Sequence, residues 1–425
     1  MEAIPFHRPY VGTEEEEAVI RVLRSGWLTT GVEALAFEKE FAEFLSQSPD
    51  PQSEYLQPEH LQSEHLQPQL LQSQLFCLAV NSATSGLHLA LEAVGVGPGD
   101  AVFIPSYTFT ATAEVVRYLG AEAVFVDIAP DSYNMDPIKL EAAISSITEK
   151  KQSSNAASAG LRPKAVIPVH IGGLPCDMEA ISGIARRYGL AVVEDAAHAF
   201  PARMPDAARW AGTCGDAGVF SFYASKTITT GEGGMVVTAR EELARRIQVM
   251  RSHGIDRPVW NRYTDTAASW FYEVVAPGFK YNLPDLLAAV GRVQLCRAMA
   301  LLEMRLAIAQ RYDRAFENEP ALIIPPPGGA RHLYTLRFME PSQRDPFIEY
   351  LRNQGIGTSV HFIPLHIMPY YQERYGLQPE DLPESYKRFR ETVSLPIWPG
   401  MSGEQADRVI EAALCFVGRH RSANP

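Results

Sequence analysis

Short apolar segments of strand length recur between residues 76 and 222, and helical or polar segments separate them. The expected strands cover residues 76–80, part of 99–112, 121–127, 164–170, 190–193 and 219–222. Strands that alternate with helices in this way predict an α/β protein with a mostly parallel sheet and crossover helices. In such a sheet, ligands bind beyond the carboxyl ends of the strands. Polar side chains that directly follow a strand are therefore the first candidates for a functional site.

One such candidate lies in residues 215–234, GDAGVFSFYASKTITTGEGG, which predict a strand, a turn and a glycine-rich corner. Lys226 lies in the turn among small and hydroxylated residues. Gly231, Gly233 and Gly234 lack Cβ, so the backbone can turn sharply there and be approached closely. A lysine beyond the carboxyl end of a strand is placed to hold a cofactor aldehyde as a Schiff base. The alternative is a solvated lysine in a surface turn.

A second candidate is the segment 190–199, LAVVEDAAHA, in which a buried-strand pattern ends in Glu194 and Asp195. A carboxylate at this place suits the pyridinium nitrogen of pyridoxal phosphate, because an ionised acid keeps that nitrogen protonated. His198 follows three residues later and is placed to bond the phenolic oxygen of the same ring. The alternative is a pair of strand-end acids at a turn with an incidental histidine, and the residues alone leave both interpretations of Asp195 open.

Residues 81–94, NSATSGLHLALEAV, predict a turn that leads into a helix, with hydroxyls at Ser82, Thr84 and Ser85. Helix N-termini bind phosphate through free N–H groups and the helix dipole. Ordinary capping needs only one such hydroxyl, and three are present, so we favour a phosphate site. Ser221, five residues before Lys226, is a further candidate for the same phosphate.

EDAAHA and the segment 215–234 together resemble the DegT/DnrJ/EryC1/StrS family of sugar aminotransferases. The resemblance extends from GWLTTG at residues 26–31 to LPIWPGMS at residues 395–402. It implies the fold type I of pyridoxal-phosphate-dependent transferases, as in aspartate aminotransferase. Residues 1–305 would then form an N-terminal segment and a large, mostly parallel sheet domain, and residues 306–425 a smaller C-terminal α/β domain.

The resemblance also implies roles for single residues around pyridoxal 5′-phosphate. Lys226 would hold the cofactor and move protons, Asp195 would pair with the ring nitrogen, and His198 would bond the phenolic oxygen. Phe109 would stack on the ring. The phosphate would lie near the segment that contains Ser82, Thr84 and Ser85, and near Ser221.

Further residues are implied at the substrate and at a neighbouring subunit. The segment 278–282, GFKYN, would reach into the neighbouring subunit's site with Lys280 and Asn282, where many family members have Asn and Arg. This implies a homodimer with composite sites. Substrate contacts are expected from Thr30 and Gly31 of GWLTTG and from the histidines of GIGTSVHFIPLHIMPYY, which are His361 and His366.

The implied activity is transfer of an amino group from glutamate to a keto group of a nucleotide-linked hexose. We expect amination at C4 of a UDP- or dTDP-linked deoxyhexose, in amino-sugar and surface-polysaccharide biosynthesis. A related subfamily that dehydrates ketosugars has His in place of the lysine, so Lys226 favours transamination. Two alternatives stay open: a lyase or dehydratase of the same fold, and a non-catalytic ligand-binding regulator, which intact Lys226, Asp195 and His198 argue against.

Composition excludes several classes of protein. The chain has 425 residues, 46% hydrophobic and 21% charged, which is typical of a globular protein. No apolar run is long enough for a membrane span, and no signal peptide is expected. The five cysteines form no CxxC pair, so we expect no metal site and a cytoplasmic location. A net charge of −12 argues against nucleic acid as a partner.

Two polar stretches interrupt this pattern. Residues 46–74 are rich in Gln, Ser, Pro and Glu, and leucines recur every five residues, which fits neither a helix nor a strand. We expect a flexible surface insertion that folding and activity do not require, because longer loops cost stability only weakly. A second polar insertion is expected at residues 148–160. Helices are expected at residues 13–23, 32–45, 242–250 and 285–302.

Overall fold

The computed structural model describes residues 2–47, 75–150, 160–206, 208–256 and 271–422. Most of the two predicted polar insertions, 46–74 and 148–160, therefore lies outside the described residues. The exception at the second insertion is residues 148–150, which continue helix α5 (Pro137–Lys150) instead of beginning a loop. Thr148 hydrogen-bonds back to Ile144 at 2.9 Å, as a helical residue does.

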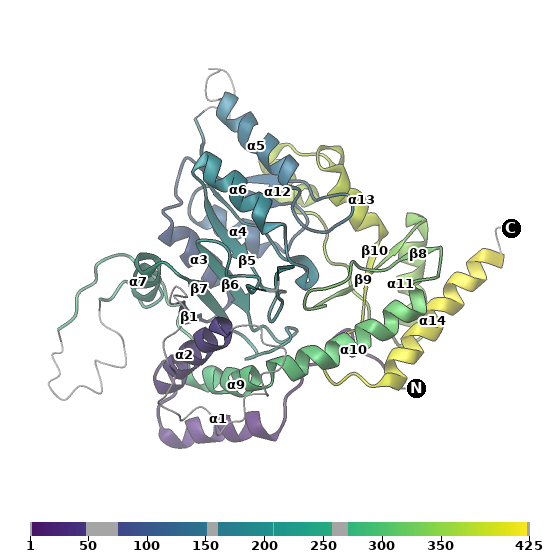
Figure 1. Ribbon diagram of the computed structural model, residues 1–425, viewed down its shortest axis with the longest axis horizontal. Coiled ribbons are helices and arrows are strands. Elements are labelled where there is room, and N and C mark those ends of the chain that lie inside the picture. The colour runs from purple at the N-terminus through teal and green to yellow at the C-terminus, as the bar shows by residue number, and fades with distance from the viewer. Residues whose placement is uncertain (1, 48–74, 151–159, 207, 257–270, 423–425) are drawn as a thin grey trace.

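A seven-stranded sheet in the order β1-β7-β6-β5-β4-β2-β3 forms the centre of the large domain (Figure 1). Its strands are β1 (Phe76–Val80), β2 (Asp100–Pro105), β3 (Glu122–Val126), β4 (Arg162–Val166), β5 (Ala191–Asp195), β6 (Ala217–Ser221) and β7 (Gly234–Thr238). β7 runs antiparallel to both β1 and β6, and the other neighbouring strands are parallel. The predicted α/β class with a mostly parallel sheet is confirmed.

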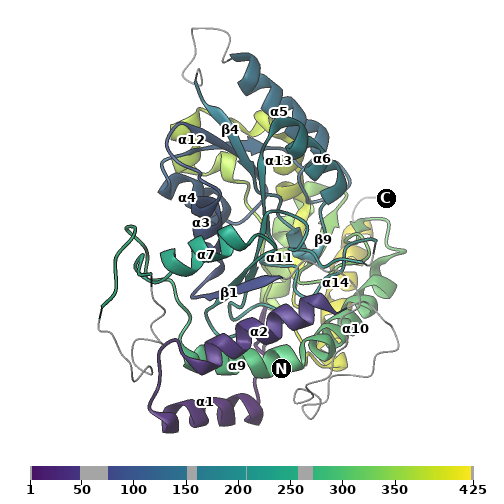
Figure 2. The same ribbon diagram turned by 60° about the vertical axis from the view of Figure 1, so that its left-hand side comes forward.

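Side chains of each strand alternate between two hydrophobic cores, one on each face of the sheet. One core packs beneath helices α3 (Ala83–Ala93), α4 (Ala111–Tyr118) and α7 (Glu241–Met250). The other packs beneath α2 (Val32–Ser46), α5, α6 (Met178–Tyr188) and α9 (Asp285–Cys296). α1 (Thr13–Ser25) lies outside this second layer against α9, as both views show (Figures 1 and 2). Helices therefore cover both faces of the sheet, so a ligand can approach it only at the ends of its strands.

The predicted single helix at residues 285–302 is wrong, because the chain forms two helices there. α9 ends at Cys296 and α10 (Ala298–Phe316) begins after Arg297, whose φ of −103° and ψ of 6° are not helical. The guanidinium of Arg297 hydrogen-bonds Glu14 and Glu15 of α1, which holds the break against α1. The apolar periodicity continues across this residue, so the sequence carries no sign of the break.

A smaller unit contains a three-stranded antiparallel sheet in the order β10-β9-β8. It comprises β8 (Leu322–Ile323), β9 (Tyr334–Phe338), β10 (Thr392–Leu395), α11 (Arg344–Asn353), α13 (Pro383–Glu391) and α14 (Gly403–Ser422). A short turn, Leu365–Ile367, and α12 (Pro369–Tyr375) instead pack on the large domain. No helix among the described residues is long and apolar enough to cross a membrane.

α10 connects the two units (Figure 1). Leu301 and Leu302 belong to the core of the large sheet, whereas Ile308, Tyr312 and Phe316 belong to the core of the small one. We therefore propose a division of the chain inside α10, near residue 305.

Candidate active site

The carboxyl ends of β1, β6, β5 and β2 meet at one edge of the large sheet, because these strands run in the same direction. A cavity of about 430 Å³ opens at this edge. The predicted site residues that line it are Ser82, Thr84, Phe109, Asp195, His198, Ser221, Lys226 and His361. The structure thus brings together residues that lie up to 279 positions apart in the sequence (Ser82 to His361).

Lys226 lies five residues beyond β6, in a turn that its own N–H closes by donating to Tyr223 O at 2.9 Å. Its Nζ is 3.5 Å from Nε2 of His332. Burial lowers the pKa of Lys226 to about 7, and Asp195 opposes this effect while Arg305 adds to it. Near neutral pH a large fraction of the side chain is therefore an uncharged amine, the form that attacks carbonyls and accepts protons.

Asp195 ends β5 and is 5% exposed. Its Oδ2 accepts a hydrogen bond from the Thr112 hydroxyl at 2.8 Å, and its Oδ1 accepts one from Ala197 N–H at 3.1 Å. Burial raises the pKa of Asp195, although both hydrogen bonds and Lys226 lower it. A buried carboxylate of this kind favours a cation placed against it, such as a protonated ring nitrogen.

His198 is a neutral hydrogen-bond donor. Its Nδ1 accepts a hydrogen bond from Gly172 N–H at 3.2 Å, which assigns the ring proton to Nε2. Burial, together with Lys226, His361 and Arg305, holds the pKa of His198 well below its ordinary value. The ring is stacked on Phe362 with 5.8 Å between centroids and 18° between planes. Its orientation at the cavity wall is therefore fixed on two sides.

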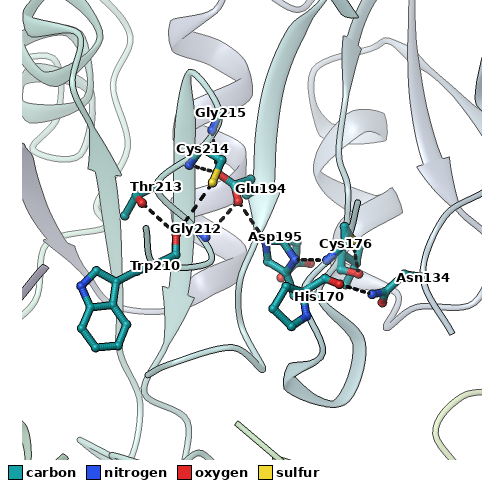
Figure 3. A network of polar contacts seen from close by, with 12 residues as sticks. Asn134, His170, Cys176, Glu194, Asp195, Trp210, Gly212, Thr213, Cys214 and Gly215 are labelled. Atoms are coloured by element: carbon teal, nitrogen blue, oxygen red, sulfur yellow. Dashed lines mark hydrogen bonds and ion pairs between the residues drawn. The ribbon is translucent and has the colours of Figure 1, made fainter. Parts of the chain in front are cut away.

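Glu194 and Asp195 face opposite sides of the sheet (Figure 3). Glu194 is fully buried, does not line the cavity, and accepts four hydrogen bonds of 2.6–2.9 Å. The donors are His170 Nε2 and the main-chain N–H groups of Gly212, Cys214 and Gly215. Glu194 thus fixes two loops beside the site, and Asp195 alone is available to a ligand.

The N-terminus of α3 presents main-chain donors to the cavity. Ser82 and Ser85 cap the helix reciprocally: Ser82 Oγ accepts from Ser85 N–H at 3.1 Å, and Ser85 Oγ donates to Ser82 O at 2.7 Å. Ser85 is consumed by this cap and does not line the cavity. Within the described ranges, the N–H groups of Ala83 and Thr84 have no hydrogen-bond partner. These two groups, with the hydroxyl of Ser221 nearby, form a cradle for an anion.

Thr30, Gly31, Lys280 and Asn282 do not line the cavity of their own chain. The Thr30 hydroxyl donates to Leu283 O at 2.6 Å and accepts from Asn282 Nδ2 at 2.6 Å, while Lys280 Nζ donates to Asn282 Oδ1. Gly31 has a packing role, because a Cβ there would lie 2.3 Å from the Trp27 ring. We call Thr30, Lys280 and Asn282 the loop cluster.

His361 and His366, which the sequence places together, are separated by the fold. His361 lines the cavity, its Nδ1 lies 2.9 Å from Ser394 Oγ, and burial lowers its pKa to about 4. His366 is fully buried away from the cavity and bonds Ser106 Oγ at 2.7 Å. The position of His366 therefore gives no support to a substrate contact.

The lining residues that the sequence analysis missed include Phe6, His7 and His332. His332 lies two residues before β9, whereas Asp195 stands at the carboxyl end of a strand, so the signal that singled out Asp195 does not apply to His332. His7 Nε2 lies 2.8 Å from Ala224 O, two residues from Lys226. Nothing in the sequence around Phe6 and His7 indicates that the N-terminal segment reaches this far.

A parallel sheet with a lysine and an aspartate at its carboxyl edge is typical of enzymes that bind an aldehyde cofactor. The sequence profile of the DegT/DnrJ/EryC1/StrS aminotransferase family matches residues 9–48 and 67–414. The chain belongs to this family.

Relatives are similar over nearly their whole length. The spore coat polysaccharide biosynthesis protein SpsC of Bacillus subtilis is 42% identical over 422 residues, 97% of each chain. Among solved structures, the PLP-form of Spr1654 from Streptococcus pneumoniae is 28% identical, with a TM-score of 0.80 over 98% of this chain and 99% of that one. PseC of Helicobacter pylori, an aminotransferase of pseudoaminic acid biosynthesis, is 25% identical, with a TM-score of 0.81 over 98% and 100%.

Proposed function

We propose that this protein is a pyridoxal-phosphate-dependent sugar aminotransferase. It moves an amino group from glutamate to the C4 keto group of a UDP- or dTDP-linked deoxyhexose. The observation that carries the proposal is the convergence of an amine, a buried carboxylate and unpaired amide donors on one cavity: Lys226, Asp195 and the start of α3. Membership of an aminotransferase family supports the reaction type.

The residues present fit pyridoxal 5′-phosphate, the cofactor named for the PLP-form of Spr1654. The N–H groups of Ala83 and Thr84 and the hydroxyl of Ser221 would hold the phosphate. Asp195 would hold the protonated ring nitrogen, and Phe109 would lie against the ring. When bound, the cofactor withdraws electrons from the carbon that carries the amino group.

The chain's own groups then orient the reactants and move protons. His198 donates from Nε2, which suits a negatively charged ring oxygen. Lys226 Nζ, with its pKa near neutrality, accepts a proton from a carbon placed beside it and returns it elsewhere. Burial lowers the pKa of the surrounding histidines His332 and His361, so they are weaker bases than Lys226 and compete poorly for that proton.

The sugar substrate is supported by two relatives, SpsC and PseC, whose names refer to polysaccharide and to pseudoaminic acid biosynthesis. We therefore place this chain in amino-sugar synthesis for a surface polysaccharide. Amination at C4 rather than C3 rests on the segment GIGTSVHFIPLH at residues 355–366, which resembles the 4-amino branch of the family more than the 3-amino branch.

Purified protein should show an absorption band near roughly 400–430 nm that glutamate removes. With a panel of UDP- and dTDP-linked 4-keto and 3-keto deoxyhexoses, we expect isotopic nitrogen to pass from glutamate to C4 of one product, as NMR would show. Nitrogen at C3 would refute the position. Loss of water without nitrogen transfer would instead identify a dehydratase, and binding without either reaction would identify a regulator.

We also propose that the working unit is a homodimer in which the loop cluster of one chain completes the cavity of the other. The rings of Phe279 and Tyr281 stack with 5.1 Å between their centroids, and the Phe279 ring lies 4.6 Å from that of His88. Because side chains alternate along an extended chain, Lys280 and Asn282 point away from this aromatic cluster. Nearby, exposed apolar side chains of α1, α2 and the loop between them offer a surface for a second copy: Ile20, Leu23, Leu28, Val32 and Leu35.

Complementation tests the composite site. Lys226→Ala and a Lys280→Ala/Asn282→Ala double variant should each be inactive alone. After subunit exchange, each mixed dimer has one intact site, so recovery should approach about a quarter of wild-type activity if exchange is random.

The matched control mixes Lys226→Ala with Asp195→Ala. Both of these residues line the cavity of the same chain, so no mixed dimer has an intact site and no activity should return. If the loop cluster mixture also stays inactive although exchange is demonstrated by mass spectrometry, the loop cluster serves its own chain.

A further inference from the structure

A fully buried arginine lies directly behind the cavity wall. Arg305 is 0% exposed on α10, at the junction between the two units. Its Nη1 donates to His332 O at 3.0 Å and to Ile397 O at 3.1 Å. His332 and Ile397 both line the cavity, so the guanidinium is separated from the cavity by one layer of residues.

The charge of Arg305 is not compensated within the described part of the chain. No carboxylate there forms an ion pair with it, and its Nε and Nη2 have no hydrogen-bond partner. By contrast, Arg331, which is also buried, pairs with Asp313 at 2.9 Å. An unpaired buried cation is costly, and a neutral donor such as Gln would satisfy a carbonyl at less cost. The site therefore retains a charge that its hydrogen bonds do not require.

This charge acts on the groups at the cavity. Arg305 contributes to lowering the pKa of Lys226, after burial, and it does the same for His7, His198 and His332. The charged or titratable groups that line the cavity with Lys226 are His7, Asp195, His198, Tyr223, Glu232, His332 and His361. Among these, Asp195 opposes Arg305 by favouring the ammonium form of Lys226.

We propose that Arg305 is a positioning residue whose unpaired buried charge disfavours the ammonium form of Lys226, while its two carbonyl bonds hold His332 and Ile397 at the cavity wall. A cation in a region of low dielectric repels a second positive charge nearby, so the ammonium form of Lys226 is the one disfavoured. The consequence for the reaction rests on the proposed role of Lys226 as proton carrier.

The test measures Lys226 itself in the full-length, cofactor-free protein. Trace acetylation with acetic anhydride at a series of pH values, read by mass spectrometry, gives the pH midpoint of each lysine. For wild type we expect about 7 at Lys226, and the exposed Lys39 in the same digest serves as the reference lysine.

Arg305→Gln should raise the Lys226 midpoint by about one unit or more, because the repelling charge is gone. At pH 7, labelling of Lys226 should then slow by about fivefold, from about half amine to about one-tenth. Arg305→Lys keeps the charge and should leave the midpoint near the wild-type value, which separates charge from shape.

An unchanged midpoint in folded Arg305→Gln, or a rise in Arg305→Lys equal to that in Arg305→Gln, would overturn the proposal. If neither variant folds, a wild-type Lys226 midpoint near about 10.4, the value of an unperturbed lysine, would still overturn the proposal, because Lys226 would then be an ammonium at neutral pH. None of these outcomes depends on aminotransferase activity, so failure here and failure of the proposed function are separable.

Discussion

Lys226→Ala should leave a folded protein without measurable turnover, at least about 10⁴-fold below wild type. The side chain is the only amine on the wall of the cavity, within the described residues, and its low pKa matches proton transfer near neutral pH. The neighbouring histidines are poor replacements as proton acceptors, because burial lowers the pKa of each and makes it a weak base. The measurement is nitrogen transfer from glutamate together with the absorption band, and both should be absent.

Lys226→Ala should lose turnover without a comparable loss of thermal stability. Burying an ammonium is unfavourable, so its removal costs little apart from lost packing. The melting temperature of the cofactor-free protein should stay within a few degrees of wild type. Lys39→Ala, at an exposed lysine on α2, is the matched control and should retain both the band and turnover. Turnover in purified Lys226→Ala would remove Lys226 from the mechanism.

The sequence predicts best those site residues that lie at or just beyond the ends of strands. Asp195, Ser221 and Lys226 follow buried strands, and parallel strands bring such residues to one edge without any knowledge of long-range contacts. The choice of Asp195 over Glu194 came from the family resemblance, because adjacent residues of a strand point to opposite faces and the residues alone do not say which face holds the cavity.

Other features depend on contacts between distant segments. His332 reaches the cavity from the chain just before β9, and His7 reaches it from the N-terminal segment. Arg305 of α10 lies behind the wall and donates to the carbonyl of His332. His366 resembles His361 in sequence context, yet a hydrogen bond to Ser106 takes it into the core. The break at Arg297 is set by the acids of α1, which lie about 280 residues away in the chain.

The largest loss of stability is expected from Glu194→Ala, in the network drawn in Figure 3. The fully buried carboxylate accepts from His170 Nε2 and from three main-chain N–H groups. The alanine variant leaves all four donors without an acceptor, and unsatisfied buried donors cost about 1–3 kcal/mol each before the chain relaxes. We expect the free energy of unfolding to fall by about 3–5 kcal/mol, measured by urea denaturation of the cofactor-free protein.

The loss should extend to the site, because Glu194 holds the loop that positions His198. His170 accepts from Cys176 N–H through Nδ1 at 2.9 Å, and between these two residues Gly172 donates to His198.

Glu194→Gln keeps one oxygen but turns an NH₂ group toward donors, so its effect should be intermediate. Glu241→Ala removes an exposed carboxylate from an i,i+4 pair with Arg245 and should cost less than about 1 kcal/mol. If the free energy of unfolding of Glu194→Ala lies within about 1 kcal/mol of wild type, the two loops are held by their own packing. The orientation of His198 then does not depend on Glu194.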